Sequence, residues 1–102
     1  HAVVGRMALG ALPGLRDQAQ AGDLLLCTGF HGLSALGLSD LEQGWQRYPQ
    51  ARQRHLRPLP RLREGQALAA LGLPFAMADS SDGLADACLK IAGASGVRLV
   101  VE

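Results

Sequence analysis

The sequence predicts an α+β fold, a mixed α/β sandwich in which helices cover a mixed β-sheet. Residues 24–27 form a continuous apolar run, which is typical of a strand covered on both faces. Residues 73–78 and 97–101 are short apolar segments on either side of a helical pattern, and this order predicts a parallel, right-handed βαβ unit. At 102 residues, the chain accommodates one domain at most, with a thin core.

The elements follow in order from an extended segment at residues 2–7 and a buried strand at residues 23–28. Apolar side chains at helical spacing permit a helix over residues 32–42, although Gly37 weakens it. Residues 43–55 are polar and helical in tendency, with an interruption at Pro49.

Prolines and glycines set the limits of the later helices. Pro60 precedes a predicted helix over residues 61–71, because proline is tolerated in the first turn of a helix, and Gly72 ends it. A last helix is predicted from apolar residues that recur at i, i+4 and i+7 and from the terminating Gly96; these apolar residues are Leu84, Cys88 and Ile91.

Composition narrows the range of functions. The formal net charge of +1 gives no electrostatic case for binding nucleic acid or an anionic membrane. No apolar run approaches the roughly 18 residues needed to cross a bilayer, and the first residues lack the layout of a signal peptide, so the expected location is cytoplasmic. Cys27 and Cys88 are predicted to be buried thiols without a disulfide.

The turn before the last helix carries the residues most suited to chemistry. Asp79 and Asp82 are three residues apart, so both carboxylates can point toward one hard cation such as Mg²⁺, which takes oxygen ligands and often retains substrate phosphates. Ser80 or Ser81 can cap the helix, whose first N–H groups can also face an anion. The alternative is an ordinary N-cap with acidic residues that complement the helix dipole.

Four blocks of the chain resemble the thiamine-monophosphate kinases. The segment from Asp79 to Leu84 is similar to their Asp-x-Ser-Asp-Gly-Leu motif, and Arg16 stands ahead of a Gly-Asp pair and a predicted strand, as in that family. Residues 28–38 resemble their Thr-Gly-x-x-Gly-x-Ser-Ala-x-Gly-Leu turn, and residues 54–61 read Arg-His-Leu-Arg-Pro-Leu-Pro-Arg, like their Arg-His-Leu-Arg-Pro-x-Pro-Arg signature.

The resemblance implies a site and an activity. These kinases belong to the superfamily of aminoimidazole ribonucleotide synthetase, and they transfer the γ-phosphoryl group of ATP to thiamine monophosphate with Mg²⁺. By position, Asp79 and Asp82 match magnesium ligands, whereas Arg16 and Ser81 match residues that contact ATP. Residues 1–102 are then expected to be part of the carboxy-terminal domain of a homodimeric enzyme, truncated and without the amino-terminal metal-binding domain. No general base is identifiable.

Some assignments stay open at this point. The basic cluster Arg54, Arg57, Arg61 and Arg63 surrounds two prolines, which favours a scaffold role over direct catalysis. We assign no site role to His31 or His55, because a histidine without a second ligand is more often an ordinary polar residue. Two rival functions remain, namely another ATP-using synthetase of the superfamily and a non-catalytic dimerisation or regulatory module.

Overall fold

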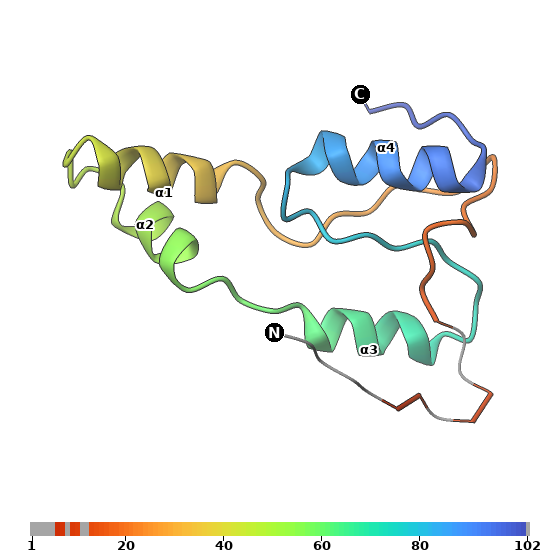
Figure 1. Ribbon diagram of the computed structural model, residues 1–102. Helices are drawn as coiled ribbons and strands as arrows, with labels where there is room; N and C mark the ends of the chain where they lie inside the picture. Colours follow the sequence, from red (N-terminus) through yellow and green to blue (C-terminus); the bar gives the residue numbers. More distant parts are fainter. Residues whose placement is uncertain (1–5, 8, 11–12, 102) are drawn as a thin grey trace. The chain divides into compact units, whose positions relative to one another are not determined.

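The computed structural model describes residues 6–7, 9–10 and 13–101 (Figure 1). Its helices are α1 (Leu33–Glu42), α2 (Pro49–Leu56), α3 (Leu62–Ala70) and α4 (Leu84–Ser95). The helices expected over residues 32–42, over residues 61–71 and between Leu84 and Gly96 are confirmed. The expected interruption at Pro49 is wrong, because residues 43–48 are not helical and Pro49 lies in the first turn of α2, where proline is tolerated. The chain divides into two units, a helical-hairpin unit (Leu26–Leu62) and a turn unit made of His1–Leu25 and Arg63–Glu102.

The helical-hairpin unit is built on the packing of α1 against α2. Gly37 of α1 is buried against Ala51 of α2, which is only 2% exposed, and a Cβ atom at Gly37 would collide with the Ala51 carbonyl. The absence of a side chain at Gly37 thus permits the close approach of the two helices. The glycine that weakens the helical pattern in the sequence is required by the tertiary contact.

A buried carboxylate on α1 binds both the loop that connects the two helices and α2 itself. Asp40 is fully buried, its Oδ1 accepts a hydrogen bond of 2.9 Å from the Arg47 N–H, and its Oδ2 lies 3.7 Å from the Arg52 Nε. Its backbone carbonyl accepts a further bond of 3.2 Å from the Trp45 N–H. Because a buried charge is tolerated only when it is paired, Asp40 ties the connecting loop and α2 to the end of α1.

In the turn unit, glycines define both ends of α4. Gly83 precedes the helix with φ of 105°, and Gly96 ends it in the left-handed conformation with φ of 67°. The N–H of Val97 then donates to the Ala92 carbonyl at 3.1 Å. The expected stop at Gly96 is confirmed, but the expected serine cap is wrong, because Gly83 occupies the cap position and no described side chain caps the helix.

The predicted α+β fold with a mixed sheet is wrong for this structure. Within residues 6–7, 9–10 and 13–101 there is no strand, and the only β-type pairing is an isolated parallel bridge between Leu15 and Ala76. Leu24 and Leu26 are 86% and 77% exposed, so the apolar run is not covered on both faces. The predicted βαβ unit around α4 is wrong as well, because neither residues 73–78 nor residues 97–101 form a strand. Residues 2–5 of the first extended segment lie outside the described residues.

The predicted sheet failed because an apolar run does not by itself make a strand. Apolar residues favour burial, but a strand also needs a neighbouring backbone about 4.8 Å away to which its N–H and C=O groups can bond. The Leu15–Ala76 bridge supplies one such bond, from the Met77 N–H to the Leu15 carbonyl at 3.0 Å. A single bond aligns two segments without making a ladder.

The described side chains bury little apolar surface. Ala51 and Ala87, at 2% and 6% exposure, are the hydrophobic residues that count as buried among them. Both cysteines are free, and Cys27 is exposed, so its predicted burial is wrong, whereas Cys88 is half-buried. None of the helices in the described part of the chain combines the length and the apolar character that crossing a membrane requires.

Candidate functional site

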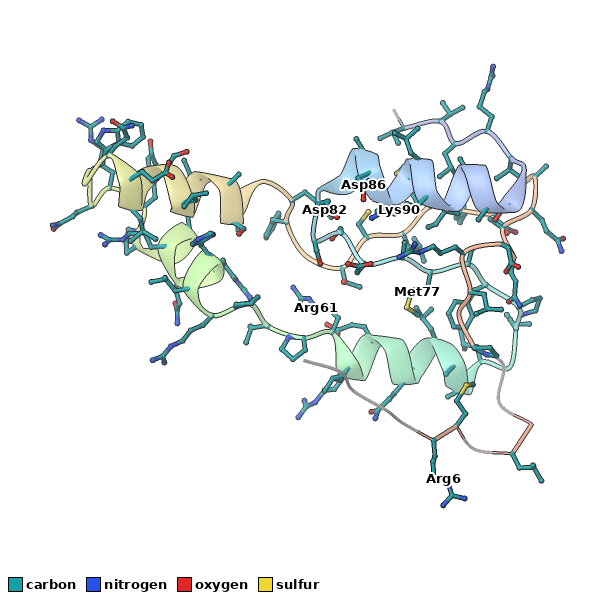
Figure 2. All side chains as sticks on the ribbon, in the orientation of Figure 1. Arg6, Arg61, Met77, Asp82, Asp86 and Lys90 are labelled. Atoms are coloured by element: carbon teal, nitrogen blue, oxygen red, sulfur yellow. The ribbon has the colours of Figure 1, made fainter. Side chains whose placement is uncertain are left out.

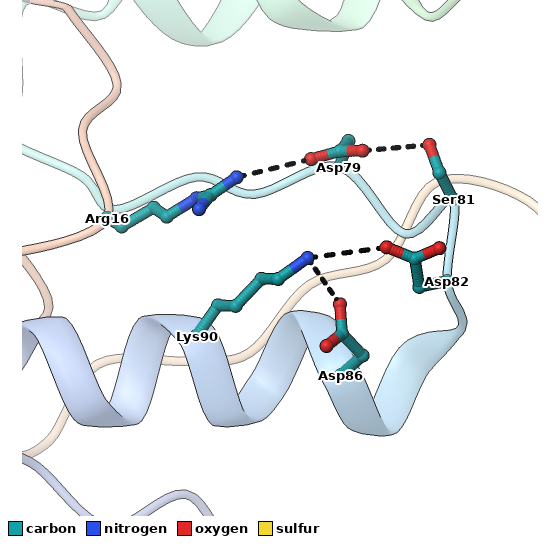
Figure 3. Close-up of polar contacts among 6 residues, drawn as sticks. All are labelled: Arg16, Asp79, Ser81, Asp82, Asp86 and Lys90. Atoms are coloured by element: carbon teal, nitrogen blue, oxygen red, sulfur yellow. Dashed lines mark hydrogen bonds and ion pairs between the residues drawn. The ribbon is translucent and has the colours of Figure 1, made fainter.

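The candidate site begins with a contact between two distant parts of the sequence. Arg16 Nη2 lies 3.5 Å from Asp79 Oδ1, and Ser81 Oγ donates a hydrogen bond of 2.8 Å to Asp79 Oδ2 (Figure 3). The Arg16 and Asp79 side chains are 50% and 63% exposed. The structure thus brings three of the four residues expected at the site into one cluster, the Arg16–Asp79–Ser81 cluster, which is open to solvent.

Backbone contacts bring Arg16 to this turn. The residue before it, Leu15, pairs with Ala76 in the parallel bridge, three residues ahead of Asp79. Gly14 makes the approach possible, since a Cβ atom there would lie 2.6 Å from Phe75 Cε2 and 3.1 Å from Met77 Cβ. A side chain at position 14 would therefore displace the Phe75 and Met77 side chains from their present positions.

Asp82 lies in a second cluster of charges, with residues of α4. Lys90 Nζ is 2.6 Å from Asp86 Oδ2 and 3.4 Å from Asp82 Oδ2, and Figures 2 and 3 show the three side chains grouped together. The Asp82 side chain is 74% exposed and that of Lys90 34%. Sequence reasoning missed Asp86 and Lys90 as site residues, although their i, i+4 acid-to-lysine spacing was a signal that they pair.

The two clusters influence each other electrostatically. The pKa of Asp79 is lowered, first by the Ser81 hydroxyl and then by its own backbone N–H, with smaller contributions from the positive charges of Lys90 and Arg16. The pKa of Lys90 is raised, chiefly by its hydrogen bond to Asp86. The ionised forms of both groups are thereby favoured at neutral pH.

The Ser81 hydroxyl is expected to control the titration of Asp79. Replacing Ser81 with alanine should raise the Asp79 pKa toward the ordinary aspartate value of about 3.9, because the largest cause of the lowering is removed. In the native chain, the contribution of ionised Asp79 to stability is present above that value and is lost as the pH falls through the lowered pKa. A carboxyl-carbon NMR titration measures the midpoint, with Ser80→Ala as the matched control. An unchanged midpoint in Ser81→Ala would contradict the assignment.

An open hollow of about 610 Å³ adjoins the Arg16–Asp79–Ser81 cluster. It is lined by residues of three segments, namely Gly14, Leu15, Arg16, Asp17, Met77, Ala78, Asp79 and Ala94. Apolar side chains thus lie beside an arginine and two carboxylates in this open hollow.

The structure adds no metal ligand to this cluster among the described residues, and His55, to which we assign no site role, lies in the other unit. His55 belongs to the helical-hairpin unit, where its Nδ1 lies 3.0 Å from the Ser34 Oγ. The described residues contain no group of three or more histidine, cysteine or acidic side chains arranged to hold a metal ion.

Comparison with known proteins identifies the family. The family model described as "AIR synthase related protein, C-terminal domain" matches residues 20–102. The chain belongs to this family. The predicted relationship to the aminoimidazole ribonucleotide synthetase superfamily is thereby confirmed. No solved structure matches the chain.

Similar proteins of known name are thiamine-monophosphate kinases. The chain is 44% identical over 96 residues to a thiamine-monophosphate kinase of Synechococcus elongatus. The aligned region covers 85% of this chain and 29% of the Synechococcus protein. It is 43% identical over 101 residues to the thiamine-monophosphate kinase of Mycobacterium tuberculosis, covering 95% of this chain and 30% of the relative. The chain thus spans about three tenths of the length of these relatives.

Proposed function

We propose that this chain is part of an ATP-dependent kinase that phosphorylates thiamine monophosphate to thiamine diphosphate. The observation that carries the proposal is the identity of 43–44% with thiamine-monophosphate kinases over 85–95% of the chain. The activity is proposed for the whole protein, and we propose that residues 1–102 belong to its carboxy-terminal domain, a proposal that the family match over residues 20–102 supports.

Asp79 and Asp82 are the proposed magnesium ligands. The chemistry of the donor set supports this assignment, since both groups offer only oxygen atoms and both are more than 60% exposed, leaving room for water and phosphate. Mg²⁺ commonly binds one or two carboxylates together with substrate phosphates, so a cage of three protein ligands is not required. When bound, Mg²⁺ supplies neutralisation of the charge on the transferring phosphoryl group.

Arg16 and Ser81 are the proposed contacts to ATP, with Lys90 as an additional positive group. A guanidinium is permanently charged and matches the geometry of phosphate oxygens. The start of α4 adds support, because no described side chain caps it and its first N–H groups can face an anion. Positioning and charge neutralisation are the main demands of phosphoryl transfer, so we assign no covalent nucleophile and no general base.

For the whole enzyme we further propose a cytoplasmic homodimer. The resemblance of the four sequence blocks to thiamine-monophosphate kinases supports this proposal. The formal net charge of +1 on residues 1–102 gives this part of the enzyme no electrostatic reason to bind nucleic acid or a membrane.

A comparison of two proteins tests the proposed activity. The full-length enzyme should form thiamine diphosphate from thiamine monophosphate and ATP only when Mg²⁺ is present. The 102-residue chain alone should show no turnover above a no-enzyme control, because the matched relatives are more than three times as long. Thiamine diphosphate formation is followed by chromatography. Inactivity of the full-length enzyme would refute the proposed activity. Turnover by the pure 102-residue chain would refute the proposal that it is only a part of the active enzyme.

A further inference from the structure

Ser95, the last residue of α4, connects the end of that helix to the Arg16 loop. Its hydroxyl donates a hydrogen bond of 2.7 Å to the Arg16 carbonyl and accepts one of 3.0 Å from the Ala19 N–H. The partners are 79 and 76 positions away in the sequence. One side chain therefore makes both a donor and an acceptor bond to the same loop, which fixes the position of residues 16–19 relative to α4.

The backbone of Arg16 is consequently held on both sides. On one side, the Leu15 carbonyl accepts the bond of 3.0 Å from the Met77 N–H, and on the other, Ser95 holds the Arg16 carbonyl at 2.7 Å. The Arg16 side chain is itself 50% exposed and pairs with Asp79 at 3.5 Å, a weak contact. Its guanidinium is thus aimed mainly by the backbone to which it is attached.

We infer that Ser95 is a positioning residue that aims Arg16 at the phosphate groups of the bound nucleotide, an inference that rests on the proposed function. Ser95 acts through the Arg16 backbone and does not line the adjoining hollow. The role needs a hydroxyl at the carboxyl end of α4. Threonine retains that hydroxyl, whereas alanine removes both bonds. The helix end should persist in either variant, because Gly96 provides the left-handed cap.

The kinetic experiment compares Ser95→Ala, Ser95→Thr and Ser39→Ala in the full-length enzyme. Ser39→Ala is the matched control, a serine of α1 outside the site. We expect Ser95→Ala to raise the KM for ATP about tenfold, equivalent to the roughly 1.4 kcal/mol of a tenfold change in affinity. The KM for thiamine monophosphate should stay unchanged, and Ser95→Thr should recover most of the loss. An unchanged KM for ATP in Ser95→Ala would overturn the inference.

A double-mutant cycle separates positioning from general destabilisation. In an Arg16→Ala background, Ser95→Ala should have little further effect on the KM for ATP, because the group that it aims is already gone. Equal effects with and without Arg16 would show that Ser95 acts elsewhere and would overturn the inference.

A readout that needs no turnover distinguishes failure of this inference from failure of the proposed function. In the same full-length enzyme, Ser95→Ala should accelerate hydrogen exchange of the Ala19 amide and broaden the range of Arg16 guanidinium motion in NMR relaxation. Ser39→Ala should change neither. If these two signals were unaffected, Ser95 would not position Arg16, whatever reaction the enzyme catalyses.

Discussion

Asp79→Asn and Asp82→Asn in the full-length enzyme are each expected to lower magnesium-dependent ATP turnover by roughly a hundredfold or more. An amide has nearly the shape of a carboxylate but carries no charge to offset a phosphate-bound cation. Folding should be little affected, because both side chains are more than 60% exposed and exposed ion pairs contribute little to stability. Kinase assays and thermal melts measure the two effects separately.

The matched control is Glu42→Gln, which makes the same carboxylate-to-amide change at the exposed end of α1. Its turnover should equal that of the wild type. If the two aspartates served only to complement the helix dipole, asparagine would be tolerated and activity would hardly change. Wild-type turnover in both aspartate variants would therefore remove the proposed magnesium site.

The second large effect is expected at Gly37, where α1 meets α2. Gly37→Ala should destabilise the helical-hairpin unit by about 2–3 kcal/mol, because the added methyl group collides with the Ala51 backbone and cannot be relieved by a side-chain rotation. This cost exceeds the roughly 1 kcal/mol that alanine contributes over glycine in a helix. Urea unfolding followed by circular dichroism measures the difference.

Gly65→Ala provides the control for helix propensity. Gly65 lies inside α3, and a Cβ atom there meets nothing within 4 Å. Alanine at this position should be neutral or stabilising by up to about 1 kcal/mol. Equal stability of the Gly37→Ala and Gly65→Ala variants would contradict the close packing of α1 on α2.

The family of this chain could be read from its sequence, since the four short blocks preserve the order of a known enzyme and the family match spans residues 20–102. The positions of the candidate site residues came from the same blocks. Arg16 and Asp79, assigned to one site by resemblance alone, are 3.5 Å apart in the structure. Their contacts with Mg²⁺ and ATP stay predictions.

The sequence by itself determined most of the helices, because a helix forms bonds within its own segment and its end depends on local residues such as Gly96. It did not determine the start of α2, since Pro49 was expected to interrupt a helix and instead lies in its first turn. Only the tertiary structure decided whether a sheet forms and which side chains meet at the candidate site. The expected sheet is absent from the described residues because apolar runs do not specify backbone partners. Lys90 contacts Asp82 across 8 positions of sequence, and Ser95 donates a hydrogen bond to the Arg16 carbonyl across 79 positions. Short motifs and helical periodicity do not predict contacts at these separations.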